Sequence, residues 1–147
     1  MRINDEKFTR ILALDYGAKR IGIALCDPLL TFAYPFKTIQ NDNKIWNELS
    51  SLIEEKAVQK IILGYPYKES GEPTEISKKI KKFRDELENR FKLEVILWDE
   101  RYTSSIAEEM MLESVNKKSK RRDKGIIDRN AAAIILQEYL NELQLKE

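Results

Sequence analysis

The chain has 147 residues, of which 42% are hydrophobic, and this suits one globular domain with its own core. It contains no histidine, which excludes Ser-His-acid triads, Cys-His pairs and the usual zinc sites. The formal net charge is only +1, so basic charge for nucleic-acid binding has to be found locally rather than in a global field.

The sequence predicts a single domain over residues 1–147, with residues 1–8 as a loose polar lead-in. No apolar stretch approaches the length that spans a bilayer, and no charged-then-apolar leader opens the chain, so we expect no membrane association. The lone Cys26 leaves no internal disulfide and fits a reducing compartment. We therefore expect a cytoplasmic protein.

Two apolar runs near the start predict a hairpin. Strands are expected at residues 9–15 and 20–26, joined by a short turn in which Gly17 supplies a positive φ. A third, weaker strand is expected at residues 33–38. These three segments predict an antiparallel meander.

The middle of the chain alternates helix and strand. Asn41 and Asp42 offer an N-cap for a helix that begins near residue 45. The runs "KIILGYP" (60–66) and "LEVILWDE" (93–100) are typical of buried strands. Between them, apolar residues at helical spacing predict an amphipathic helix: Ile76, Ile80, Phe83, Leu87 and Phe91.

The last third of the chain reads as helical. Ser105 and Glu108 form a capping box for a helix, a basic loop is expected at residues 116–125, and a long helix at about 126–143. This order of elements predicts an α/β fold. We expect a five-stranded mixed sheet with antiparallel pairs early, parallel pairs late, and helices on both faces.

Carboxylates stand at the ends of three of these elements. Asp15 ends the first strand, Asp99 and Glu100 end the last strand, and Asp128 lies in the first turn of the final helix. Ligands of open α/β sheets gather outside strand ends, and we expect the first and last strands to be neighbours there. Clustered acids repel one another unless a cation lies between them, and an all-oxygen ligand set favours Mg²⁺ or Mn²⁺.

Each acid also has a structural interpretation when taken alone. Asp15 could be a turn former, and Asp128 could simply favour the helix dipole. It is the three together, in this order of elements, that favour a catalytic and metal-binding site made of Asp15, Glu100 and Asp128. Strand alternation sends Asp99 and Glu100 to opposite faces, so one of the two should serve.

A basic run precedes the final helix and is a candidate nucleic-acid contact. On its own such a run is often a solvated loop, but this one leads into the helix that carries Asp128 and could contact a phosphate backbone. Lys19 and Arg20 adjoin Asp15, and Arg101 adjoins Glu100, where it either contacts nucleic acid or orients the acids. The basic run comprises Lys117, Lys118, Lys120, Arg121, Arg122 and Lys124.

Other conspicuous side chains are interpreted as structural. The lysines from Lys78 to Lys82 alternate with apolar positions of an amphipathic helix, which is typical of a solvated face. Trp46 and Trp98 are expected in the core rather than as platforms for bases.

Four segments resemble successive motifs of the YqgF family: "LDYGAKRIGIALCDP", "ILGYPYKESG", "LWDERYTS" and "IDRNAAAIILQEYL". The likeness runs from about Ile11 to Leu140, in order and with matching spacing. Members are RNase H-like proteins described as pre-16S rRNA nucleases and as Holliday-junction-resolvase-like proteins. The resemblance implies an RNase H-like fold and a metal-dependent phosphodiesterase whose acids match Asp15, Glu100 and Asp128. Cys26 stands where the family more often has serine.

The resemblance favours Glu100 over Asp99 and a nuclease that processes the 5′ end of pre-16S rRNA, with two Mg²⁺ (or Mn²⁺) ions about 4 Å apart. The alternatives are a DNA resolvase of the Holliday-junction type and a non-catalytic nucleic-acid-binding protein. An rRNA precursor is the preferred partner and a DNA junction is the other. The chain could act as a monomer or as a homodimer, and a resolvase would need a two-fold dimer to cut symmetric strands.

Overall fold

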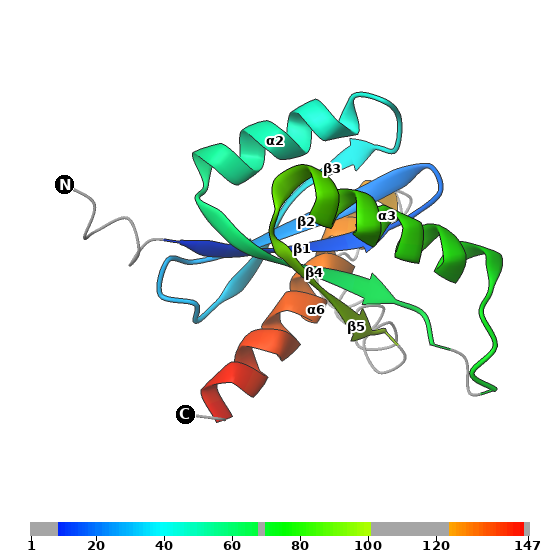
Figure 1. Ribbon diagram of the computed structural model, residues 1–147. Coiled ribbons are helices and arrows are strands. Elements are labelled where there is room, and N and C mark those ends of the chain that lie inside the picture. Colours follow the sequence, from blue (N-terminus) through cyan, green and yellow to red (C-terminus); the bar gives the residue numbers. More distant parts are fainter. Residues whose placement is uncertain (1–8, 68–69, 101–123, 146–147) are drawn as a thin grey trace.

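The computed structural model describes residues 9–67, 70–100 and 124–145 (Figure 1). In these ranges the chain forms five strands and three helices. In chain order they are β1 (Arg10–Tyr16), β2 (Arg20–Cys26), β3 (Ala33–Gln40), α2 (Ile45–Glu55), β4 (Val58–Tyr65), α3 (Glu75–Phe91), β5 (Glu94–Asp99) and α6 (Lys124–Leu145).

The strands form one mixed sheet in the order β3-β2-β1-β4-β5. β1–β2 and β2–β3 are antiparallel, whereas β1–β4 and β4–β5 are parallel, which confirms the predicted arrangement. The expectation that the first and last strands are neighbours is wrong. The crossover through α2 returns β4 to the open edge of β1, so β5 pairs with β4 instead.

Helices cover both faces of the sheet, as predicted. Alternate residues of β1 point to opposite faces: Leu12 and Leu14 pack in one cluster, and Ile11 and Ala13 in another. The first cluster lies under α2 and α3 and the second under α6 (Figure 1). We call these the α2/α3 face and the α6 face.

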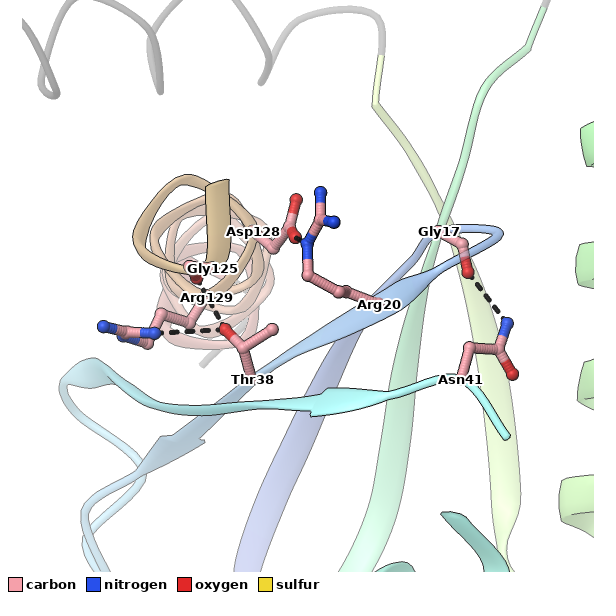
Figure 2. Close-up of polar contacts among 7 residues, drawn as sticks. All are labelled: Gly17, Arg20, Thr38, Asn41, Gly125, Asp128 and Arg129. Atoms are coloured by element: carbon pink, nitrogen blue, oxygen red, sulfur yellow. Dashed lines mark hydrogen bonds and ion pairs between the residues drawn. The ribbon is translucent and has the colours of Figure 1, made fainter. Parts of the chain in front are cut away.

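α6 crosses its face of the sheet with a buried stripe at helical spacing: Ala132, Ile135, Leu136, Tyr139 and Leu140. In the C-terminal half of α6, the Gln137 side chain accepts a hydrogen bond from Ala33 N (2.8 Å) and donates one to Thr31 O (3.1 Å). These bonds fix the helix to the loop after β2. At the near end, Thr38 Oγ1 donates to Gly125 O and accepts from Arg129 Nη1 at 3.2 Å (Figure 2).

α6 comes closest to the sheet over Gly22 of β2. A Cβ atom at Gly22 would overlap the backbone of Asp128 and Arg129. Only a residue without a side chain lets the helix approach so closely at this point. Gly22 thereby sets the height of Asp128 above the sheet.

Several local expectations are corrected. Gly17 has no positive φ, and it is needed instead because a Cβ there would lie 2.6 Å from Arg20 O. β3 extends beyond residue 38 to Gln40. α2 begins after Lys44 with no side-chain cap, because Asp42 Oδ1 accepts from Lys44 N instead.

The final helix also begins earlier than expected. α6 starts at Lys124, so Lys124 and Gly125 belong to the helix rather than to the loop expected at 116–125, and Asp128 follows the first turn. The remainder of that loop and the helix expected after Ser105 lie outside the described residues. No helix in the described part of the chain is long and apolar enough to cross a membrane.

The close approach at Gly22 gives a stability prediction. Gly22→Ala should lower the free energy of unfolding by roughly 1–3 kcal/mol or more, because the added Cβ meets helix backbone that has no room to move. Gly64→Ala on β4 is the matched control, since its Cβ meets only the ends of the Glu100 and Ile135 side chains. Thermal unfolding of both variants measures the difference. Equal losses would contradict the proposed role of Gly22.

Candidate functional site

Asp15 and Glu100 meet on the α6 face, at the end of the sheet where β1, β4 and β5 finish. In β1, Asp15 continues the alternation of Ile11 and Ala13. In β5, Ile96 and Trp98 pack on the α6 face, so Glu100 continues that alternation. The two carboxyl groups are hydrogen-bonded to each other.

Gly64 of β4 lies between these two acids. It follows Leu63, the register partner of Leu14, and pairs with Trp98 on its other side. A Cβ atom at Gly64 would overlap the Glu100 carboxylate. The missing side chain is therefore the gap through which Glu100 reaches across β4 to Asp15.

Burial governs the protonation of the pair. Burial, followed by the carboxylates of Glu100 and Asp128, raises the pKa of Asp15 well above its ordinary value of 3.8. Burial also raises the pKa of Glu100, although the hydrogen bond from Asp15 opposes the rise and the charge of Asp99 adds to it. The pair therefore holds a proton to a higher pH than these acids do in water when nothing else neutralises it.

Asp128 lies within electrostatic range of Asp15, but its carboxylate is engaged elsewhere. Its Oδ2 accepts from Arg20 Nε at 3.0 Å, as Figure 2 shows, and the two side chains are 23% and 30% exposed respectively. Strand alternation explains the contact, since Arg20 and Gly22 share the α6 face of β2. In the described residues no group of three or more acids is arranged to hold a metal ion.

The basic residues that were predicted to contact nucleic acid either lie around this site or fall outside the described residues. Lys19 is exposed in the β1–β2 turn, and Lys124 is exposed in the first turn of α6. The remaining basic candidates fall outside the described residues: Arg101, Lys117, Lys118, Lys120, Arg121 and Arg122.

Sequence reasoning missed the residues that shape the site without carrying its charge. Gly22 and Gly64 flank Asp15 on the two neighbouring strands, one opening space for α6 and the other for Glu100. A glycine inside an apolar strand signals a close approach, so this signal was present in the sequence. Thr38 and Arg129, which tether the start of α6, had no comparable signal.

The raised pKa of Asp15 gives a pH-dependent prediction for the metal-free protein. An acid whose pKa is raised by folding stabilises the fold at low pH, and this contribution is lost as the pH rises above the ordinary value of 3.8. Asp15→Asn should therefore melt higher than the wild type in EDTA at neutral pH. The difference should shrink toward zero as the pH falls to about 4, where Asp15 is protonated.

The measurement is a series of thermal scans of both proteins in chelator from about pH 4 to pH 7. Asp85→Asn removes an exposed carboxylate from α3 and controls for the change in net charge. A variant at Asp15 that melts lower than the wild type at neutral pH would make Asp15 a structural turn residue instead.

Comparison with known proteins places this arrangement in a family. The family model described as "RuvX: Holliday junction resolvase" matches residues 9–142. A "Putative pre-16S rRNA nuclease" of Sulfurihydrogenibium sp. is 40% identical over 92% of this chain and 92% of its own length. A protein of the same name from Syntrophus aciditrophicus is 41% identical over 91% of this chain and 89% of its own length.

Solved structures agree on the fold. RuvC of T. thermophilus, in complex with a Holliday junction substrate, has a TM-score of 0.59 at 11% identity, over 92% of this chain and 96% of its own. The Fowlpox virus resolvase, in complex with Holliday junction DNA, has a TM-score of 0.58 at 13% identity, over 91% and 98% respectively. The fold is that of the RuvC-like resolvases, which confirms the expected RNase H-like class. On the family model and the identities above, the chain belongs to the RuvX (YqgF) family.

Proposed function

We propose that this chain is a nuclease that hydrolyses phosphodiester bonds of structured nucleic acid with a divalent cation, and that its substrate is the precursor of 16S rRNA, at its 5′ end. The observation that carries the proposal is the hydrogen-bonded pair of Asp15 and Glu100 beside Asp128, in a chain of a nuclease family. The names of relatives at 36–41% identity support the rRNA substrate.

The residues present fit a hard divalent cation. Asp15, Glu100 and Asp128 offer oxygen atoms alone, which is the donor set that Mg²⁺ and Mn²⁺ prefer. The proton shared by Asp15 and Glu100 marks a place where negative charge is buried and needs neutralising. A cation that replaces this proton would relieve the same repulsion, and we propose two ions of Mg²⁺ or Mn²⁺.

When bound, a divalent cation supplies Lewis acidity that activates water and stabilises charge on the leaving oxygen. Asp15 and Glu100 would hold it on the sheet side, and Asp128 from the side of α6. These carboxylates need not transfer protons themselves, which is consistent with a chain that lacks histidine. The chain's own task is to bring the three acids to one place and to orient the phosphate there.

Arg20 has two tasks in this proposal. It pairs with Asp128 at 3.0 Å in the described structure, and it also stands at the edge where a phosphate of the substrate would arrive. A phosphate that accepts hydrogen bonds from the guanidinium would free the Asp128 carboxylate to turn toward the cation. Substrate binding and completion of the ligand set would then be linked.

The remaining basic residues are proposed as contacts to the phosphate backbone. Lys19 projects from the turn that follows Asp15, and Lys124 opens the helix that carries Asp128. Arg101 and the segment from Lys117 to Arg122 adjoin Glu100 and α6 in sequence, which is the support for including them. Their charge is local, in a chain whose net charge is only +1.

The family model is described as a Holliday junction resolvase, so cleavage of four-way DNA junctions is a second candidate function. That function needs a two-fold dimer, whereas cutting one rRNA strand does not. A non-catalytic nucleic-acid-binding role leaves the contact between Asp15 and Glu100, with Asp128 in electrostatic range, without a purpose. We further propose that the chain is a single domain that works in the cytoplasm.

The proposal predicts that Asp15→Asn, Glu100→Gln and Asp128→Asn each reduce magnesium-dependent cleavage by roughly 100-fold or more. Each change removes an anionic oxygen from the cation site and keeps the size of the side chain. The measurement is cleavage of a pre-16S rRNA fragment and of a four-way DNA junction, with thermal scans to confirm folding.

Asp99→Asn is the matched control, since it removes an acid of the same strand that alternation sends away from Asp15. We expect it to retain cleavage. Cleavage near the wild-type rate in any two of the three site variants would overturn the proposed site. Preference between the rRNA fragment and the junction decides between the two substrates.

A further inference from the structure

A cavity of about 390 Å³ opens on the α2/α3 face, on the other side of the β1–β2 turn from the acids. Its walls come from Tyr16 at the end of β1, from Ala18 of the turn, from residues 41–43 and the first turn of α2, and from α3. None of the residues assigned to the acid site lines it. The proposed acid site therefore does not explain this cavity.

Aromatic rings form one wall. The ring centroids of Tyr16 and Phe83 are 5.0 Å apart, and those of Phe83 and Trp46 are 5.3 Å apart. Phe83 is buried between the other two, whereas Tyr16 and Trp46 are partly exposed at the cavity. The Arg90 guanidinium lies over the Trp46 ring, 4.3 Å from its centroid, so that face of Trp46 is not available to a base. Aromatic faces in such a position are platforms on which nucleic-acid bases stack without sequence preference.

Two lysines and two acids line the cavity. Lys79 and Lys82 are exposed on its α3 side, and neither forms an ion pair within the described ranges. Each of the two acids of the lining has a contact of its own, although only Glu86 is near a cationic side chain. Glu86 Oε2 lies 3.7 Å from Arg90 Nε, and Asp42 Oδ1 accepts from Lys44 N at 2.9 Å. A phosphate would therefore find two free ammonium groups beside an aromatic wall.

The cavity is joined to the acid site by a fixed turn. Asp15 and Tyr16 are consecutive, and strand alternation sends them to opposite faces. Asn41 holds the turn, with Nδ2 donating to Gly17 O at 2.8 Å (Figure 2) and its backbone N donating to Lys19 O at 2.9 Å. A strand whose phosphate lies at the acids reaches the cavity by passing over this turn and its exposed Lys19.

We propose that this cavity binds one unpaired nucleotide that flanks the cleaved phosphate, with its base stacked on Tyr16 and Trp46 and its phosphate paired with Lys79 and Lys82. The assignment rests on the proposed nuclease function for the identity of the strand. It gives Trp46 and two lysines of α3 a role in binding, where the sequence favoured a core residue and a solvated face.

Tryptophan fluorescence tests the stacking, because the chain has only two tryptophans. Trp98→Phe leaves Trp46 as the single reporter, and Trp46→Phe leaves Trp98, which packs against Tyr139 on the α6 face. Each variant is titrated in EDTA with a short single-stranded oligonucleotide, as RNA and as DNA. We expect quenching in Trp98→Phe and none in Trp46→Phe, and the strand type that quenches more strongly is the one the cavity prefers.

Salt dependence tests the phosphate contacts in the protein with both tryptophans present. Lys79→Ser with Lys82→Ser should lower the slope of log affinity against log salt by about 0.7, which is the value for one phosphate contact on a single strand. Lys78→Ser with Lys81→Ser removes the same charge from the same helix outside the cavity lining, and we expect it to leave the slope unchanged.

Equal effects of the two lysine pairs, or quenching that follows Trp98 instead of Trp46, would overturn the assignment. Neither result affects the acid site, because all titrations are made without metal and without cleavage. Conversely, if the Asp15 and Glu100 variants still cleave, the proposed acid site is wrong, but nucleotide binding measured at the cavity is unaffected.

Discussion

The contact between the partly buried carboxyl groups of Asp15 and Glu100 is the constraint around which this end of the molecule is organised. Two acids on strands separated by β4 share a hydrogen bond, and burial raises the pKa of both. Such a pair destabilises a fold unless a proton or a cation neutralises it. A cation site explains why such a pair is present at the end of an otherwise apolar sheet.

Glycine makes this contact possible on both sides of Asp15. Gly64 leaves the gap through which Glu100 crosses β4, and Gly22 lets α6 descend so that Asp128 comes into range. Thr38 and Arg129 then fix the first turns of the helix against β3. The acids come from three separate elements, but their positions depend on the shape of one sheet face.

Much of this arrangement was predictable from the sequence. The apolar runs of β1 and β2 and the helical periodicity of α3 predicted those elements. Alternation in β5 indicated that Asp99 and Glu100 could not both serve. Strand order was not predictable, because nothing in the residues of β5 says whether it pairs with β1 or β4. The Arg20–Asp128 pair was not predictable either, since it depends on how α6 crosses β2. The same holds for the cavity at Trp46, which is formed by residues from three separate segments. The motif likeness, by contrast, predicted the family directly, and the family model confirms it.

The most direct test of the central claim is a crystal structure of the wild-type protein grown with Mn²⁺, with anomalous diffraction used to locate the metal. We expect anomalous density between Asp15 and Glu100, with their mutual hydrogen bond broken and Asp128 still paired with Arg20 in the absence of substrate. An empty site in saturating Mn²⁺, with Asp15 and Glu100 still bonded to each other, would contradict it.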